Sequence, residues 1–110
     1  MLAAVIRAIG QLNASDGLDF VIGTTNDFDP YVRAEALETL KRIDPTPNDG
    51  RSSAAAREAL NDPRDSIVHI ASQLVAQYRD SSAVPTLQRI TQARPALASA
   101  AYDALRQLGQ

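Results

Sequence analysis

Hydrophobic residues in this chain recur at spacings of three and four, the period of one face of an α-helix. The clearest stripe lies within residues 30–43, and similar stripes run through residues 2–12, 67–78 and 97–108. The four stripes align on one residue each: Ile9, Leu40, Val75 and Leu105. Their steps of 31, 35 and 30 residues indicate an internal repeat, which is typical of stacked supersecondary units.

A second set of shorter helices is predicted between the stripes. These helices span residues 16–24, 52–60 and 81–90. The longest connection, residues 44–50, contains two prolines and a glycine and explains the step of 35 residues. No stretch alternates with period two, so we expect an all-α protein without strands.

Proline and short polar residues mark several helix ends. Asp29 precedes Pro30 and is predicted to cap the helix that starts there, and Arg94 before Pro95 is a poorer cap in the same place. The last short helix has two serine candidates for its cap: Ser81 and Ser82. Gly109 is a candidate for the residue just past the last helix.

One segment carries a family resemblance. It reads Asp-Phe-Asp-Pro-Tyr-Val-Arg over residues 27–33, followed by Ala36, Leu40 and Ile43. It is similar to the D-x-D-P-x-V-R-x-x-A-x-x-A-L pattern of HEAT-like repeats, specifically the short bacterial type first associated with phycobilisome lyases. Thr39 stands where the pattern has alanine.

Two further copies of the pattern are weaker. The segment 61–68 has Val68 where arginine is usual, and the copy that starts at Arg94 lacks the aspartate and the arginine. The resemblance implies that the aspartate and arginine of the pattern are structural. Asp29 would cap its helix, and Arg33 would pair with carboxylates of the loop or of the adjacent repeat.

The resemblance and the periodicity together predict a single domain over residues 1–110. Its fold would be a short right-handed α-solenoid of antiparallel helix pairs, with six or seven helices in about three and a half repeats. The expected boundaries are 1–27, 28–61, 62–92 and a partial repeat over 93–110. Alanine, which accounts for 19 of the 110 residues, would lie where paired helices approach closely.

Composition limits the chemistry. The absence of cysteine excludes disulfides, thiolate metal sites and a cysteine nucleophile. The net charge of −2 without a basic run argues against strong non-specific binding to nucleic acid or anionic membranes. The apolar segment 2–10 is too short to span a bilayer and follows no basic segment, so a cytoplasmic protein is expected.

No catalytic, cofactor or metal site is predicted. His69, the only histidine, lies within a predicted helix and is expected to be partly exposed. Four aspartates lie near helix starts and are expected to act as caps rather than as acid–base pairs: Asp27, Asp29, Asp62 and Asp65. The glycines form no phosphate-binding loop.

A partner-binding face is predicted on the shorter helices, where some side chains oppose the apolar stripe. The candidates are Phe20, Arg57, Glu58, Arg89 and Gln92. Phe20 is the main candidate anchor. The alternative is that Phe20 packs against the neighbouring repeat or beneath the loop near Phe28.

The favoured function is a non-enzymatic scaffold or adaptor that binds a protein or peptide. The family resemblance also suggests a subunit that assists bilin attachment to, or removal from, a phycobiliprotein. A nucleic-acid-binding repeat is a third hypothesis and requires four basic side chains on one strip: Arg51, Arg57, Arg89 and Arg94. The chain's ends would expose apolar residues such as Val5 and Ile9, or Leu97 and Leu105. We therefore expect a piece of a longer repeat protein, or copies that cover each other's ends.

Overall fold

A computed structural model describes residues 17–46 and 50–110, and all regular elements in these ranges are helices. The α-helices are α2 (Leu18–Thr24), α3 (Pro30–Ile43), α4 (Arg51–Ala59), α5 (Asp65–Gln77), α6 (Val84–Ala93) and α7 (Ala98–Gln107). Two 3₁₀-helices, η2 (Ser81–Ala83) and η3 (Pro95–Leu97), lead into α6 and α7. The all-α prediction is confirmed, and the helix predicted over residues 2–12 lies outside the described residues.

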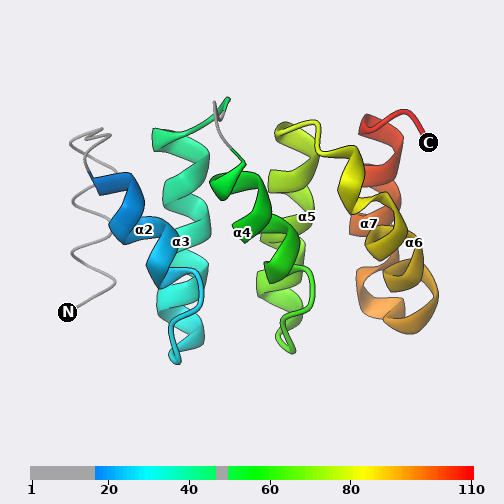
Figure 1. Cartoon of the computed structure of the whole chain (residues 1–110). Coiled ribbons are helices and arrows are strands. Elements are labelled where there is room, and N and C mark those ends of the chain that lie inside the picture. The colour runs from blue at the N-terminus through cyan, green and yellow to red at the C-terminus, as the bar shows by residue number, and fades with distance from the viewer. Residues whose placement is uncertain (1–16, 47–49) are drawn as a thin grey trace.

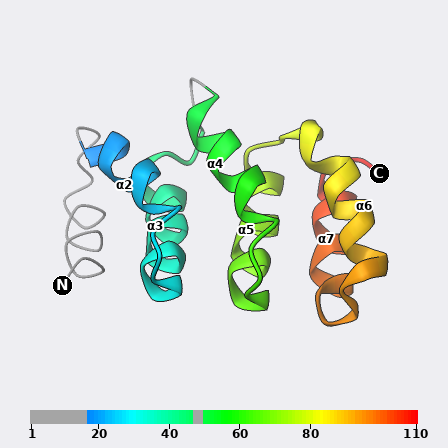
Figure 2. The same cartoon turned by 60° about the horizontal axis from the view of Figure 1, so that its bottom comes forward.

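The helices form two layers (Figures 1 and 2). Helices α2, α4 and α6 form one layer, and the helices α3, α5 and α7 form the other. Consecutive helices joined by short connections pack in pairs: α2 with α3, α4 with α5, and α6 with α7. Helix α5 also packs against α3 and α7, so the core continues from one pair to the next. This arrangement is the predicted solenoid. The predicted boundaries at 27/28 and 61/62 fall in the α2–α3 and α4–α5 connections, whereas the boundary at 92/93 falls in the last turn of α6.

Alanine occupies the places where helices meet. Ala36, Ala71, Ala101 and Ala104 are each at most 2% exposed, as predicted. Larger side chains such as Leu74 fill the space beside them and are fully buried. Small side chains let helix backbones approach, while the leucines supply most of the apolar area removed from water.

Two of the predicted helix caps have different outcomes. Asp29 caps α3 as expected, because its carboxylate accepts a hydrogen bond from the Tyr31 amide at 2.9 Å. The serine caps predicted before α6 are wrong. The cap there is Asp80, whose carboxylate accepts from the Ser82 amide at 3.1 Å and starts the 3₁₀ turn η2.

Helices α5 and α7 end in the same hydrogen-bond pattern. The Asp80 amide donates to the Val75 carbonyl, and the Gln110 amide donates to the Leu105 carbonyl, each across five residues. This Schellman geometry needs a left-handed residue just past the helix. Gly109 fills that place in α7 with φ 86°, as predicted, whereas Arg79 fills it in α5 with φ 57°.

Guanidinium groups join neighbouring helix pairs. Arg33 of α3 donates to both carboxylate oxygens of Asp62, at 2.7 and 3.2 Å, and to the carbonyls of Asp27 and Phe28. The predicted pairing of Arg33 with the adjacent repeat is therefore confirmed. The Arg33 guanidinium thus links the α2–α3 loop to the α4–α5 loop.

Arg94 makes the equivalent contacts for the next loop. It donates to the carbonyls of Asp62 and Pro63, which lie 35 residues after those that Arg33 contacts. It also pairs with Asp65 at 2.5 Å. Because Val68 is buried where the pattern has arginine, the guanidinium that holds this loop comes from the following repeat instead.

A polar cluster anchors the start of the α3–α4 connection. The buried Ser52 hydroxyl donates to the Asp44 carboxylate at 2.5 Å, and the Tyr78 hydroxyl lies beside them, 3.4 Å from the Leu40 carbonyl. Burial raises the pKa of Tyr78 well above its usual range, and the Asp44 charge adds to that effect. The cluster joins the end of α3 to α4 and to the end of α5.

The expectation of exposed leucines at the C-terminal end is wrong. Leu97 is 4% exposed and Leu105 is 7% exposed, and both belong to the core. Leu97 lies in a small space between α5, α6 and α7, beside Val68 and Leu87. The prediction failed because it treated the end of the helical pattern as the end of the packing. The corresponding residues Val5 and Ile9 lie outside the described residues.

Candidate interaction surface

A groove runs between α4 and α6 on the outer side of their layer. It has a volume of about 470 Å³. Its walls are small or polar side chains: Ala54, Arg57, Glu58, Asn61, Ser82 and Thr86. The first four come from α4 and the residues after it, and the last two come from η2 and α6. The groove therefore lies between two neighbouring repeats.

Three of the five predicted partner-binding residues belong to this groove or its rim. Arg57 and Glu58 line the groove, and the Arg89 guanidinium lies 3.4 Å from the Asn61 side-chain oxygen. Glu58 and Arg89 are exposed and Arg57 is half-buried. The projection of α4 and α6 as helices correctly placed these residues off the core stripe.

Arg57 also has a structural role that sequence reasoning missed. It donates to the Asp80 carboxylate at 2.6 Å, and Asp80 is the cap that starts η2. The Asp80 side chain is only 9% exposed, so the pair is partly shielded from water. The ion pair therefore links α4 to the start of η2, two of the elements that line the groove. No local sequence signal marks Asp80 as the partner of Arg57.

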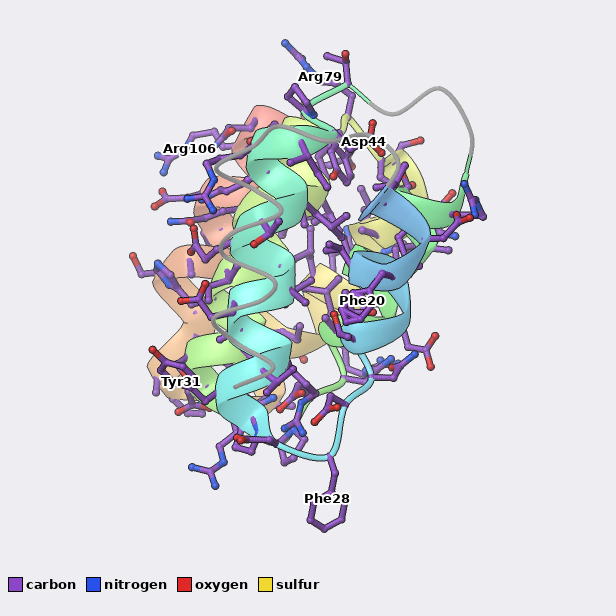
Figure 3. The ribbon with its side chains drawn as sticks, turned by 90° about the vertical axis from the view of Figure 1, so that its left-hand side faces the viewer. Phe20, Phe28, Tyr31, Asp44, Arg79 and Arg106 are labelled. Atoms are coloured by element: carbon purple, nitrogen blue, oxygen red, sulfur yellow. The ribbon has the colours of Figure 1, made fainter. Side chains whose placement is uncertain are left out.

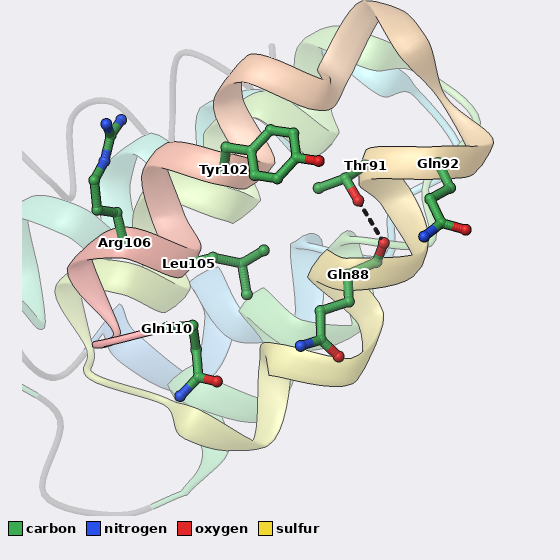
Figure 4. A pocket seen from close by; sticks show the side chains of 7 residues that line it. All are labelled: Gln88, Thr91, Gln92, Tyr102, Leu105, Arg106 and Gln110. Atoms are coloured by element: carbon green, nitrogen blue, oxygen red, sulfur yellow. Dashed lines mark hydrogen bonds between the residues drawn. The ribbon is translucent and has the colours of Figure 1, made fainter.

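Gln92 lies in a different hollow, between α6 and α7 (Figure 4). This end groove has a volume of about 650 Å³. Its lining residues are Gln88, Thr91, Gln92, Tyr102, Leu105, Arg106 and Gln110. Sequence reasoning missed Tyr102, which is 59% exposed there. A projection of α7 like that made for the shorter helices could have found it, because Tyr102 lies off the Ala101, Ala104 and Leu105 stripe.

Phe20 and Phe28 lie apart (Figure 3). Phe20 is 41% exposed on α2, next to the fully buried Val21. Phe28 is 99% exposed at the tip of the α2–α3 loop and points away from the helices. The Phe28 side chain therefore does not cover Phe20.

The arginines proposed for nucleic-acid binding face carboxylates. Arg51 pairs with Asp19, Arg57 with Asp80, and Arg94 with Asp65. Nucleic-acid binding needs arginine charge to neutralise phosphates, and here that charge is already neutralised by carboxylates. Three of the four arginines that this hypothesis needs are therefore held in ion pairs with carboxylates.

The structure places the histidine and the acidic side chains that the sequence singled out. Within residues 17–46 and 50–110, no group of three or more acidic or histidine side chains could hold a metal ion. His69 is exposed on α5, where its ring nitrogen lies 3.2 Å from the Gln73 amide. Asp27 and Asp62 accept hydrogen bonds from amides two residues on, so both stabilise loops.

Comparison with protein families matches residues 1–75 to the HEAT repeats. The match covers more than half of the chain and includes the segment 27–43 that carries the sharpest pattern. The chain belongs to the HEAT repeat family. None of the curated proteins compared matches it. The finer resemblance to the phycobilisome-lyase type remains a prediction.

HEAT repeats are commonly protein-interaction scaffolds and are generally non-catalytic. Each HEAT unit buries its apolar face against its neighbours, which leaves the outer helix surfaces and the grooves between units for binding. In the described part of this HEAT protein, no helix is long and apolar enough to cross a membrane.

Proposed function

We propose that this HEAT repeat chain is a non-enzymatic scaffold or adaptor that binds a protein or peptide in the groove between α4 and α6. The observation that carries the proposal is the position of Arg57 and Glu58 in one groove that spans two repeats. We expect this module to act in the cytoplasm, as the sequence suggests.

The chemistry of the groove favours a polypeptide segment. Glu58 and Asn61 offer acceptors on one wall, and the Ser82 and Thr86 hydroxyls offer donors and acceptors on the other. Ala54 leaves space between them because its side chain is a single methyl group. An extended segment could exchange hydrogen bonds with both walls while its side chains enter that space.

The groove is formed before binding. The Arg57–Asp80 ion pair links α4 to the start of η2 at 2.6 Å, and Arg89 adds a weaker link to Asn61 at 3.4 Å. Preformed sites lose less conformational entropy on association than sites that must be ordered. Phe20 on α2 would add an apolar contact for a partner that extends along the layer.

The test is affinity capture from extracts of the source cells with three forms of the full chain. Ala54→Arg fills the groove, and Ala96→Arg places the same side chain at an exposed alanine in η3, outside the groove. We expect wild type and Ala96→Arg to capture at least one protein in equal amounts. Ala54→Arg should capture about tenfold less of that protein, or less still.

The measurement is quantitative mass spectrometry of the captured proteins, with circular dichroism to confirm equal helicity. A Phe20→Ala variant shows whether the same partner also uses α2. If wild type, Ala54→Arg and Ala96→Arg capture the same proteins in equal amounts, the groove is not the binding site and the proposal is wrong.

A further inference from the structure

Phe28 is the most exposed large hydrophobic residue in the described part of the chain. Its side chain is 99% exposed, whereas Phe20, Tyr31 and Tyr102 are 41%, 60% and 59% exposed. The sequence has only five aromatic residues, and Phe28 and Tyr31 lie three positions apart at the start of α3. Two of the scarce aromatics are thus displayed at one end of one helix (Figure 3).

The loop that carries Phe28 is fixed on both sides. The Arg33 guanidinium donates hydrogen bonds to the carbonyls of Asp27 and Phe28, at 3.0 and 3.1 Å. The Asp29 amide donates to the Asp27 carboxylate at 2.9 Å, and Asp29 in turn caps α3. A rigid aromatic contact loses little entropy on binding, which is the property of an interface anchor.

The residues on either side of Phe28 in the sequence are acidic. Asp27 and Asp29 flank it in sequence, and the charge of Arg33 is matched by Asp62, with which it forms a two-point ion pair. Two carboxylates therefore remain beside an apolar ring. A complementary surface would combine an apolar socket for the ring with lysine or arginine on the rim of that socket.

We propose that the Asp27–Asp29 loop is a second interaction site, in which Phe28 enters an apolar socket of a partner protein with a basic rim. The loop lies at the end of the helices, apart from the α4–α6 groove, and its residues do not line that groove. The inference therefore does not rest on the proposed groove function. Arg33 is a positioning residue for this site, since it donates to the two carbonyls on either side of the Phe28 Cα.

The equivalent position in the next repeat shows that the loop does not need a phenyl ring for its structure. Pro63 occupies that place, and its carbonyl accepts from Arg94 as the Phe28 carbonyl accepts from Arg33. The two loops thus share their backbone contacts and differ in the side chain at the tip. The phenyl ring is not needed to hold such a loop, because the equivalent loop is held without one.

The test uses phage that display random fragments of the source organism's own genome. Fragments are selected on the immobilised full chain and counter-selected on Phe28→Ser. Each enriched fragment is then purified and titrated against wild type, Phe28→Ser, Asp29→Asn and Tyr102→Ser, the last of which changes an aromatic residue that is 59% exposed on α7. Asparagine can still cap α3, so Asp29→Asn removes charge while keeping the helix start.

We expect a fragment that binds wild type and Tyr102→Ser equally and binds Phe28→Ser about 30-fold more weakly. Asp29→Asn should weaken binding severalfold at low salt and much less at high salt, because the lost contact is a screened rim charge. Phe28→Ser should keep the melting temperature of wild type, since the replaced side chain buries almost nothing.

Three results would overturn the inference. In the first, no fragment distinguishes wild type from Phe28→Ser. In the second, such fragments exist but salt and Asp29→Asn leave their affinity unchanged, which removes the basic rim. In the third, the enriched fragment comes from this chain itself, which would assign the loop to self-association. Ala54→Arg, which fills the α4–α6 groove, should bind the same fragments as wild type does. The groove proposal can therefore fail without affecting the proposal for the Phe28 loop.

Discussion

Thr39 carries the one buried side-chain oxygen without a hydrogen-bond partner in the described part of the chain. Its side chain is fully buried in α3, between the α2 and α5 contacts of that helix. The HEAT-like pattern has alanine at this place, so the departure in sequence coincides with an energetic cost in structure. A buried hydroxyl that has lost its hydrogen bonds to water is unfavourable unless the protein replaces them.

Thr39→Val should therefore stabilise the protein. Valine has the shape of threonine without the hydroxyl, so the packing is kept and the unpaired group is removed. We expect the free energy of unfolding to rise by about 1 kcal/mol, measured by urea denaturation.

Thr24→Val is the matched control for that change. The Thr24 hydroxyl is also buried but donates to the Val21 carbonyl at 2.8 Å. Its removal deletes a made hydrogen bond, so this variant should be less stable than wild type by about 0.5–1.5 kcal/mol. A loss of stability in Thr39→Val would mean that its hydroxyl is satisfied in solution.

At the scale of elements, the loops before α3 and α5 are held by guanidinium groups rather than by apolar packing. Arg33 and Arg94 each contact two loop carbonyls and a carboxylate. The Arg106–Asp103 pair, by contrast, lies on one turn of α7 and is largely exposed. The three arginines thus span a range of burial and of hydrogen-bond number.

Replacing each arginine by methionine should rank them. Methionine keeps much of the apolar stem and removes the charge. We expect Arg33→Met and Arg94→Met each to cost about 1–3 kcal/mol of unfolding free energy, with the larger loss for the less exposed Arg33. Arg106→Met should change stability by less than about 0.5 kcal/mol.

Thermal and urea unfolding of the three variants give the comparison. If Arg94→Met were as neutral as Arg106→Met, the loop before α5 would not depend on the following repeat. In that case the packing of the buried Val68, and not a guanidinium group, would hold the loop before α5.

The same elements show how far sequence alone leads. Periodicity predicted the helices because each one is amphipathic, and the aspartate–proline signal predicted the cap of α3 because capping is local. The role of Arg94 could not be predicted, since its partners lie about 30 residues earlier in the chain. The groove was found only in part: helix projection gave Glu58 and Arg89, but the Arg57–Asp80 pair depends on how two repeats meet.

Across the whole molecule, stability should vary from one helix to another because a solenoid has only nearest-neighbour contacts. Helix α5 packs against α3, α4 and α7 and buries seven of its residues. Among residues 17–46 and 50–110, helix α2 packs mainly against α3 and buries two of its own residues. Opening α2 exposes little apolar area, whereas opening α5 disrupts the core on both sides.

Amide hydrogen exchange should therefore be slowest in α5 and faster in α2 by about 100-fold or more. Hydrogen exchange followed by mass spectrometry, with peptides covering both helices, measures this difference directly. Leu74→Ala, in the centre of α5, should accelerate exchange in α3, α4 and α7 together, because all three lose their common neighbour. If α2 and α5 exchanged at the same rate, the chain would open as one unit despite its linear arrangement. Contacts between repeats would then outweigh the stability of each helix pair, and the arginine links between loops would be the first interactions to test for that coupling.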